Sequence, residues 1–455
     1  LWADLDGDPG HLTSVRGTGD AVVLPSAFDV TGFATATVAA ACLAVAELAA
    51  ARAGTAVPAV AVDRRRAAAS FRAEALLSAE GWELPPPWDP VAGDYEAADG
   101  WIRLHTNYDG HRRAALDVLG VGPDRDAVAA AVARRPADAL EEAVVDAGGA
   151  AAVLRSHDAW RAHPAGAATA GERPVVLGPP LPITGGGGGP GAVRPGAAPL
   201  AGIRVLDLTR VIAGPLATRF LAAHGADVLR IDPPGFEEVP ALLPETTLGK
   251  RCAALDLTAR ADRARFEALV AEAHVVVGGL RPGALDALGY GPADLRRRNP
   301  SIVTVTHDAY GWAGPWAGRR GFDSLVQMST GIAAAGAVAA GVAHPVPLPA
   351  QALDHGTGHL LAAAACRALT RLVTTGDAAD VRGSLVGAAN VVLGSPIPGG
   401  LDAAAPTWTD ADTEPATSAW GPLRRAPLGG TIDGHPVTWS VEPGPLGRHE
   451  PTWST

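Results

Sequence analysis

Between residues 200 and 395, short apolar runs alternate with longer segments of helical composition. The first run, Ile203 to Leu208, is aliphatic and partly β-branched, which predicts a buried strand. Ala213-Gly-Pro215 then opens a helix that we expect over 217–223, since proline suits a first helical turn. A second strand is expected over 226–231. This alternation predicts a mostly parallel α/β sheet.

The turn after the first strand can direct backbone N–H groups toward a phosphate or a nucleotide. The turn lacks the G-x-G-x-x-G pattern, so it matches a dinucleotide-binding fold only weakly. We therefore expect a ligand-binding turn without a plain dinucleotide site.

The first 180 residues carry a different pattern. An alanine-rich segment predicts one long helix over 30–52, and Val60-Ala-Val62 predicts a short strand. Two strand-like pieces within 94–105 flank Asp99-Gly100, a pair typical of hairpin turns. Three further helices are expected over 111–119, 125–134 and 137–147.

Glycine and proline are concentrated between residues 181 and 199. Such a density cannot build a packed element, which predicts an exposed linker. A phosphate-binding loop is the alternative, but no Lys-Ser or Lys-Thr pair follows the glycines. We therefore divide the chain into four parts, which are 1–180, the linker 181–199, 200–395, and an irregular Trp- and Pro-rich tail over 396–455.

The composition indicates a folded, soluble protein, with 47% hydrophobic and 19% charged residues. The net charge of −11 gives no long-range attraction for nucleic acid or for an anionic membrane. Three cysteines without metal-ligand spacing fit a reduced, cytoplasmic setting. The apolar stretch from Phe33 to Ala49 is mostly alanine, so we expect a packed helix there and no membrane span. No signal peptide is expected at the acidic N-terminus.

Several motifs in the second half resemble the class III CoA-transferases, the family of formyl-CoA and carnitine CoA-transferases. The first is the strand and turn over 200–215. The later motifs, in the family's order, include Gly249-Lys-Arg251, Arg281-Pro-Gly-Ala-Leu-Asp286, Asn299-Pro-Ser301, Gly321-Phe-Asp323 and Ala352-Leu-Asp354. The resemblance covers residues 200–390 and implies a Rossmann-like, mostly parallel sheet with a second, smaller α+β domain.

The first half resembles the later portion of the same family. Asp99-Gly-Trp-Ile-Arg-Leu104 and the helices after it are similar to the family's smaller domain, so the family's segments occur in rearranged order. Ser26-Ala-Phe-Asp29 before one alanine-rich helix also echoes Gln351-Ala-Leu-Asp354 before another. We interpret the chain as two incomplete copies that complement each other or a second subunit.

Transfer of CoA between acids needs a carboxylate that attacks a thioester and carries the acyl group as a mixed anhydride. Asp354 lies at a helix start, where the dipole and free N–H groups can stabilise a carboxylate and offer an oxyanion site. The resemblance places the family's catalytic aspartate at this position. From the residues alone, the alternative is that Asp354 only caps the helix near Thr357. Asp29 is the rival nucleophile, although its shorter turn favours a capping role.

The resemblance also implies CoA-binding positions in the first turn and in later loops. They are Arg210, Val211, Ala213, Leu255, Gly279, Leu280 and Arg320. Arginine side chains suit phosphates, although each could equally be a solvated surface charge. Two departures leave the acyl group open, because Ile212 replaces a glutamine of formyl-CoA transferase and Ala287 replaces a CoA-binding arginine.

We expect an acyl-CoA:carboxylate CoA-transferase that works through an aspartyl mixed anhydride and an aspartyl-CoA thioester on Asp354. Acyl-CoA and a small carboxylic acid are the expected substrates, with no permanently bound cofactor, no metal, and a homodimer implied by the family. An acyl-CoA racemase is the first alternative, but Phe322 occupies the position of the racemase histidine, so an acid–base pair loses one partner. A non-catalytic CoA-binding subunit is the second alternative. His355 and His359 flank Asp354 without metal-ligand spacing.

Overall fold

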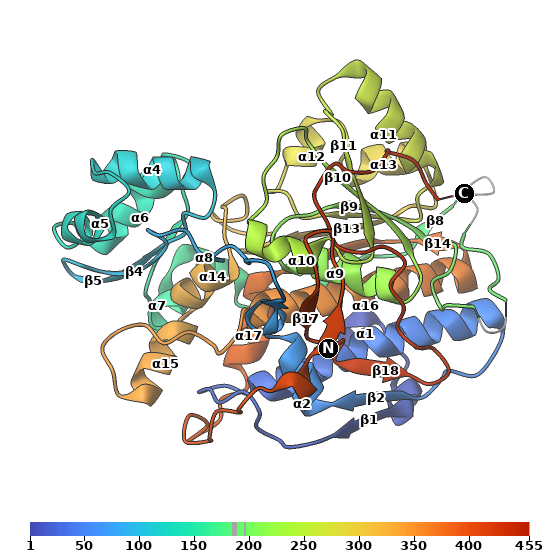
Figure 1. The fold of residues 1–455 in the computed structure, drawn as a ribbon, viewed down its shortest axis with the longest axis horizontal. Coiled ribbons are helices and arrows are strands. Elements are labelled where there is room, and N and C mark those ends of the chain that lie inside the picture. The colour runs from blue at the N-terminus through green and yellow to red at the C-terminus, as the bar shows by residue number, and fades with distance from the viewer. Residues whose placement is uncertain (184–188, 195–196, 455) are drawn as a thin grey trace.

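A seven-stranded sheet forms the centre of the molecule (Figure 1). Its strand order is β11-β10-β9-β12-β13-β15-β7, and neighbouring strands are parallel except for β15 and β7. The computed structural model describes residues 1–183, 189–194 and 197–454. The strand bounds are β7 Val175–Leu177, β9 Arg204–Leu208, β10 Asp227–Asp232, β11 Lys250–Ala254, β12 Val275–Gly278, β13 Val303–Asp308 and β15 Asp380–Ser384. The predicted mostly parallel α/β sheet is confirmed.

The first βαβ unit consists of β9, α9 (Ala213–Ala223) and β10. The helix begins at Ala213 and not at the expected Ala217, because Pro215 fits the first turn, where N–H groups have no helical acceptor. The strand order reverses at β9, since β10 lies on one side of it and β12 on the other. In such sheets, ligands bind in the crevice at the carboxyl ends of the strands that flank the reversal.

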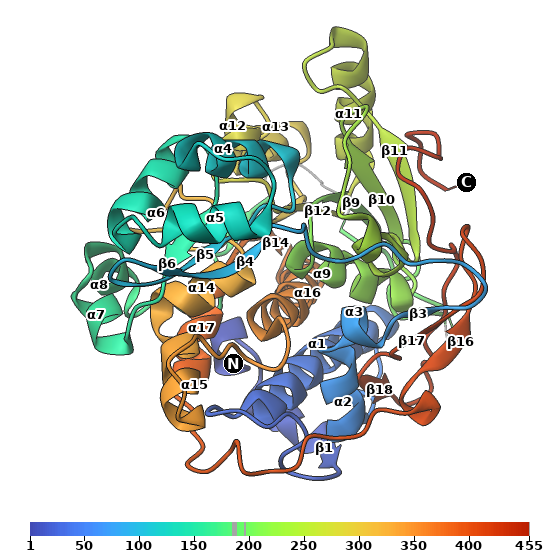
Figure 2. The same cartoon turned by 60° about the vertical axis from the view of Figure 1, so that its left-hand side comes forward.

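Two long helices, α1 (Val30–Ala53) and α16 (Ala352–Thr375), lie side by side in the core (Figures 1 and 2). A glycine permits their close approach, because a Cβ on Gly356 would lie 2.2 Å from the ring of Phe33. By length and composition α1 could cross a membrane, but 83% of its most apolar stretch is buried inside the structure. The prediction of a packed helix is therefore confirmed.

The elements around α1 repeat those around α16. Each helix leads into a strand and then a short helix, which are β2 (Val60–Asp63) and α2 (Arg64–Ser70) after α1, and β15 and α17 (Leu385–Leu393) after α16. β2 and β15 each have one parallel neighbour, β1 (Val15–Thr18) or β13, and one antiparallel neighbour, β18 (Gly430–Ile432) or β7. The sequence echo between Asp29 and Asp354 thus extends to the local architecture, and the rearranged order of the family's segments stays a prediction.

A smaller α+β unit lies to one side of the main sheet (Figure 1, left). Its antiparallel strands are β4 (Gly93–Ala97), β5 (Gly100–Leu104) and β6 (Ala151–Val153). Its helices are α4 (Asp109–Leu119), α5 (Arg125–Val132) and α6 (Ala137–Asp146). These elements bury an apolar cluster of their own around Ile102 and Leu140. The predicted hairpin, the three predicted helices and the smaller unit are confirmed.

Distant segments of the chain pair with one another outside this unit. β7 completes the main sheet, β18 in the tail pairs with β2, and β17 (Leu423–Arg425) pairs with β3 (Ser78–Ala79). The Arg52 guanidinium donates hydrogen bonds to the carbonyl groups of Gly191, Pro199 and Ala201, at 3.0, 2.8 and 2.9 Å. Residues 184–188 and 195–196 of the predicted linker lie outside the described residues. The four-part division of the chain stays a prediction.

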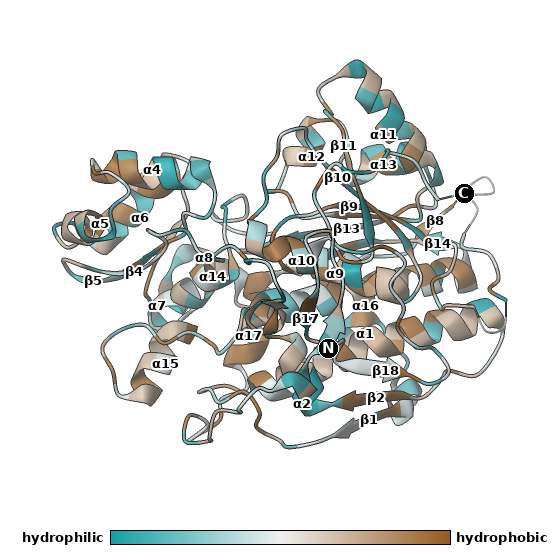
Figure 3. Ribbon diagram, viewed as in Figure 1, coloured by the Kyte–Doolittle hydropathy of each residue, from teal (hydrophilic) through white to brown (hydrophobic). Residues whose placement is uncertain are grey.

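Buried apolar residues of the central strands form much of the core, whereas α11 (Arg260–Glu272) carries many hydrophilic residues (Figure 3). This distribution places the main core between the sheet and the helices that cover it. The remaining bounds are α3 Ala73–Leu76, α7 His157–Ala162, α8 Pro164–Thr169, β8 Leu181–Pro182, α10 Leu243–Thr246, α12 Ala284–Ala287, α13 Pro292–Arg298, α14 Asp323–Thr330, α15 Ile332–Ala340, β14 Asp377–Ala378 and β16 Glu414–Ala416.

Candidate functional site

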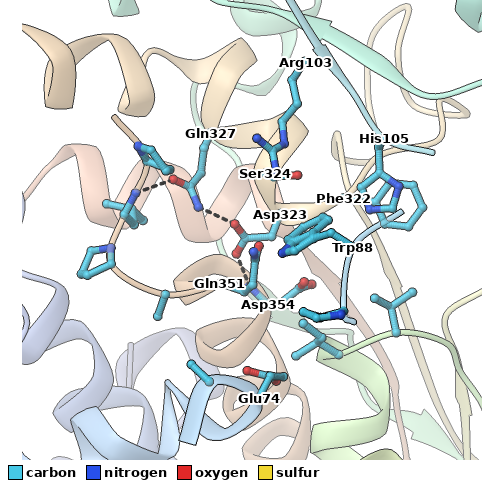
Figure 4. Close-up of a pocket in the computed structure, with 18 of the residues that line it drawn as sticks. Glu74, Trp88, Arg103, His105, Phe322, Asp323, Ser324, Gln327, Gln351 and Asp354 are labelled. Carbon is cyan, nitrogen blue, oxygen red and sulfur yellow. Dashed lines mark hydrogen bonds between the residues drawn. The ribbon is translucent and has the colours of Figure 1, made fainter. Parts of the chain in front are cut away.

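Asp354 lies in the first turn of α16, but a different carboxylate caps this helix (Figure 4). The Asp323 side chain, at the start of α14, accepts hydrogen bonds from the backbone N–H groups of Leu353 and Asp354, at 2.8 and 3.0 Å. Gln327 donates its amide to Asp323 and accepts the backbone N–H of Leu348. With the cap occupied by Asp323, the Asp354 carboxylate makes no hydrogen bond within the described chain and is free for chemistry. The capping alternative for Asp354 is therefore wrong.

The surroundings of Asp354 disfavour its charged form. Burial raises its pKa well above the usual value, and the negative charges of Asp323 and Glu74 add to this shift. We expected the helix N-terminus to stabilise the Asp354 carboxylate directly. The structure differs because the N–H groups at that terminus are directed to Asp323.

The raised pKa makes the stability cost of Asp354 depend on pH. Because its folded-state pKa lies above the unfolded-state value, Asp354 lowers stability increasingly as pH rises between the two values. Asp354→Asn removes this titration. We expect it to increase the free energy of unfolding at pH 8 by on the order of 1 kcal/mol or more, and to have little effect near about pH 4.

Urea unfolding at pH 4 and pH 8 measures this difference. Asp29→Asn is the matched control, because Asp29 caps α1 and its replacement should give no gain at high pH. An equal effect of Asp354→Asn at both pH values would contradict the prediction.

Asp354 lies where two cavities meet. The first cavity, of ≈ 300 Å³, is mostly apolar. Its apolar lining comes from both halves of the chain and includes Phe71, Trp88, Ile212, Leu242, Met328, Ala333 and Leu348. The second, of ≈ 400 Å³, is a cleft at the carboxyl ends of β9, β12 and β13. Val211, Phe322 and Asp354 line both cavities.

The cleft is rich in arginine. Arg210, Arg281, Arg319 and Arg320 all line it. Arg210 pairs with Asp232 at 2.8 Å, and Arg319 pairs with Glu141 at 2.9 Å. Arg281 and Arg320 are exposed and form no ion pair with any described residue, so both are free to meet an anion.

The structure brings together all but one of the positions expected to bind CoA. Arg210, Val211, Ala213, Gly279, Leu280 and Arg320 line the cleft beside Asp354. Leu255 does not, because its side chain is only 1% exposed and packs in an apolar cluster with residues such as Leu206 and Phe266. Leu255 is therefore a core residue in this structure.

Sequence reasoning missed two polar residues at the end of β13. His307 Nε2 and Asp308 Oδ2 are buried without a hydrogen-bond partner in the described chain, and both residues line the cleft. Burial lowers the pKa of His307 to about 4 and raises that of Asp308 to about 7. Gly279 lies against His307, since a Cβ there would be 2.3 Å from His307 Nε2. A signal was available, because polar residues that end a buried parallel strand often face a ligand.

The turn after β9 is strained. Val211 has φ +65°, which is rare for a β-branched residue and costs about 1–3 kcal/mol. Its N–H donates to the buried carboxylate of Glu238 at 3.0 Å. The Val211 N–H is thus already engaged and is not the free phosphate donor that the sequence suggested.

The first half of the chain contributes to the surroundings of Asp354. Glu74, in α3, lines the apolar cavity and lies 3.1 Å from Nε2 of His355. Burial acts to raise the pKa of Glu74, but the charge of His355 and its hydrogen bond outweigh this and lower the pKa. His355 is buried and stacks on Phe71, with ring centroids 5.3 Å apart. No sequence pattern linked Glu74 to Asp354, because α3 and α16 are distant along the chain.

Aromatic rings line the apolar cavity where the first half of the chain meets the start of α14. His105 stacks on Phe322 with ring centroids 3.6 Å apart. Trp88, with 39% of its surface exposed, forms another wall of the apolar cavity (Figure 4). The cavity is therefore closed on one side by residues of the first half.

Asp29 is positioned differently from Asp354. Its side chain accepts the N–H of Gly32 at 2.6 Å and caps α1, as the sequence favours. Asp29 lines neither cavity. Among the described residues, no group of three or more His, Cys, Asp or Glu side chains is arranged to hold a metal ion.

Comparison with known proteins supports the resemblance seen in the sequence. Residues 200–406 match the model of CoA-transferase family III. A probable fatty acyl-CoA transferase of Mycobacterium tuberculosis is 36% identical over 186 residues, which cover 38% of this chain and 47% of the relative. An acetyl-coenzyme A transferase of Hypoxylon pulicicidum is 37% identical over 164 residues, which cover 35% of this chain and 28% of the relative. The chain thus spans less than half the length of either relative.

Among solved structures, one of a hypothetical protein from Mycobacterium tuberculosis is 35% identical. The alignment covers 44% of this chain and 57% of that protein, with a TM-score of 0.39. The resemblance to CoA-transferase family III is confirmed for the second half of the chain.

Proposed function

We propose that this chain, whose residues 200–406 match CoA-transferase family III, is an acyl-CoA:carboxylate CoA-transferase with Asp354 as its nucleophile. One observation carries the proposal. Asp354 has no hydrogen-bond partner among the described residues and lies where an arginine-lined cleft meets an apolar cavity. Such a junction suits a thioester, whose CoA part is anionic and whose acyl part is less polar.

In the proposed binding mode, the CoA phosphates lie in the cleft near Arg281 and Arg320. The acyl group lies in the apolar cavity, and the thioester carbon lies at the Asp354 carboxylate. Burial of the site excludes water, which would hydrolyse both the anhydride and the enzyme thioester. The carboxylate is the reactive form of Asp354, and burial makes this form less favourable.

The proposed reaction needs no outside oxidant or reductant. An Asp354 oxygen attacks the thioester carbon, the C–S bond breaks, and CoA leaves as a thiolate from a mixed anhydride. The thiolate attacks the aspartyl carbon, the first carboxylate leaves, and an aspartyl-CoA thioester remains. The incoming carboxylate attacks that thioester and regenerates the thiolate and an anhydride. Attack of the thiolate on the new acyl carbon then releases the new acyl-CoA and Asp354.

The acyl donor and acceptor are proposed only as a class. Ile212 is apolar and lines the cavity, so it cannot donate a hydrogen bond to a formyl or oxalyl group as an amide side chain could. We therefore propose an acyl-CoA and a small carboxylic acid without assigning oxalate or formate. A homodimer and a cytoplasmic location are also part of this proposal.

Mass spectrometry of the intact protein tests the function. Incubation with a panel of acyl-CoAs should add the mass of an acyl group or of CoA minus water, and a free acid should discharge the CoA adduct as new acyl-CoA. Deuterium from solvent entering the acyl α-carbon without an adduct would identify a racemase instead. Binding of CoA with neither reaction would indicate a non-catalytic subunit.

A further inference from the structure

Val211 lies between the two cavities of the proposed site. It belongs to the turn between β9 and α9 and is one of three residues that line both cavities, together with Phe322 and Asp354. Its positive φ of 65° is a conformation that valine seldom adopts. Contacts with residues outside the turn must therefore keep Val211 at positive φ.

The Glu238 carboxylate provides that support. Its side chain is completely buried. Oε2 accepts the N–H of Val211 at 3.0 Å and pairs with Arg230 at 3.2 Å. Oε1 accepts the N–H of Val239 at 3.0 Å and the hydroxyl of Tyr108 at 2.6 Å. Each carboxylate oxygen thus has two donors, and one donor is the strained peptide itself.

Tyr108 connects the smaller α+β unit to this support. It directly precedes α4, and its ring lies in the wall of the cleft. Its hydroxyl contacts Glu238 across 130 positions of sequence. The Glu238 carboxylate that holds Val211 is therefore itself held by Arg230 of the main sheet and by Tyr108 of the smaller unit.

We propose that Glu238 and Tyr108 are positioning residues for the transfer reaction, because they hold Val211 in its left-handed conformation at the junction of the two cavities. This inference rests on the proposed function. If the hydrogen bond from Val211 to Glu238 is lost, Val211 can relax toward negative φ, and its side chain and peptide then move relative to Asp354. A small displacement of groups around a thioester is enough to slow its attack.

A double-mutant cycle tests the coupling. Glu238→Gln keeps the size of the side chain, but in either orientation its NH₂ group faces N–H donors that the carboxylate now accepts. We expect kcat/KM to fall by about 10²-fold, mostly through kcat. In a Val211→Gly background, where glycine adopts positive φ without strain, the same change should cost less than about 5-fold.

Glu245→Gln is the matched control. Glu245 is also a buried glutamate that pairs with an arginine, Arg219, but among the described residues no hydrogen bond or ion pair joins it to the Val211 turn. Its cost should be the same in both backgrounds. Tyr108→Phe should lower kcat/KM by about 3–10-fold, and this loss should also shrink when residue 211 is glycine.

Equal costs of Glu238→Gln in the two backgrounds would overturn the proposal, as would full activity of Glu238→Gln. The same double-mutant cycle can be measured without catalysis. Its readouts are then the thermal unfolding midpoint and the affinity for CoA, both obtained by calorimetry. A wild-type protein that binds CoA but transfers no acyl group would contradict the transferase function alone. In that case, the unfolding midpoints of the four proteins in the cycle would still show whether Glu238 stabilises the conformation of Val211.

Discussion

Asp354→Asn is expected to reduce acyl transfer by about 10⁴–10⁶-fold and to eliminate the covalent adduct. Its amide matches the carboxylate in shape but cannot attack a thioester. The fold should be retained, because Asp323 and not Asp354 caps α16. Transfer is measured by the appearance of new acyl-CoA, and the adduct by intact mass.

Asp29→Asn is the control for this experiment. Asparagine caps helices about as well as aspartate, so α1 should keep its cap and the enzyme its activity. Asp354→Ala should reproduce the loss seen with asparagine. Full activity of both Asp354 variants would rule out a mechanism with Asp354 as nucleophile. Loss of activity only in Asp29→Asn would show that Asp29, and not Asp354, is the nucleophile.

Lys250→Met is expected to cause the largest loss of stability, about 3–5 kcal/mol. Lys250 and Asp207 are both fully buried and pair at 2.8 Å. Lys250 also donates to the carbonyl of Pro215, while Asp207 accepts the hydroxyls of Thr209 and Thr218. This network joins β11, β9 and the start of α9. Removing the lysine leaves the buried Asp207 carboxylate without its ion-pair partner.

Urea unfolding measures this loss. Arg251→Met is the matched control, since Arg251 is the next residue and pairs with Asp227 at a partly exposed position. Its cost should stay below about 1 kcal/mol. Lys250→Met combined with Asp207→Asn should cost less than Lys250→Met alone, because the buried charge is then absent. A Lys250→Met protein as stable as Arg251→Met would contradict the importance of the buried pair.

The comparison of Asp29 with Asp354 shows what local sequence can and cannot specify. Both alanine-rich segments form helices as the sequence predicts, but Asp29 precedes α1, whereas α16 begins at Ala352, before Asp354 and not near Thr357 as expected. Asp29 caps its helix because its carboxylate is the acceptor that reaches Gly32. Asp354 lies inside the first turn of α16, and Asp323 of α14 accepts the free N–H groups of Leu353 and Asp354, so the Asp354 carboxylate has no cap to form. The role of each carboxylate therefore depends on a contact that no sequence window contains.

The sequence by itself determined the elements whose signals are local. Apolar runs predicted the parallel strands, and Asp99-Gly100 predicted the hairpin between β4 and β5. The family resemblance implied that Arg210, Gly279 and Asp354 lie near one another, and all three line the same cleft. These predictions succeed because periodicity, turn chemistry and the position of loops at the carboxyl ends of parallel strands follow from neighbouring residues.

The tertiary structure alone decided how the site is completed. It placed Glu74 against His355, directed Glu238 and Tyr108 to the Val211 turn, and buried Leu255 in the core and not in the cleft. Each outcome joins residues from separate elements or from both halves of the chain. Burial and the pairing of buried polar groups set these contacts, and both depend on how the layers pack once the helices and strands have formed.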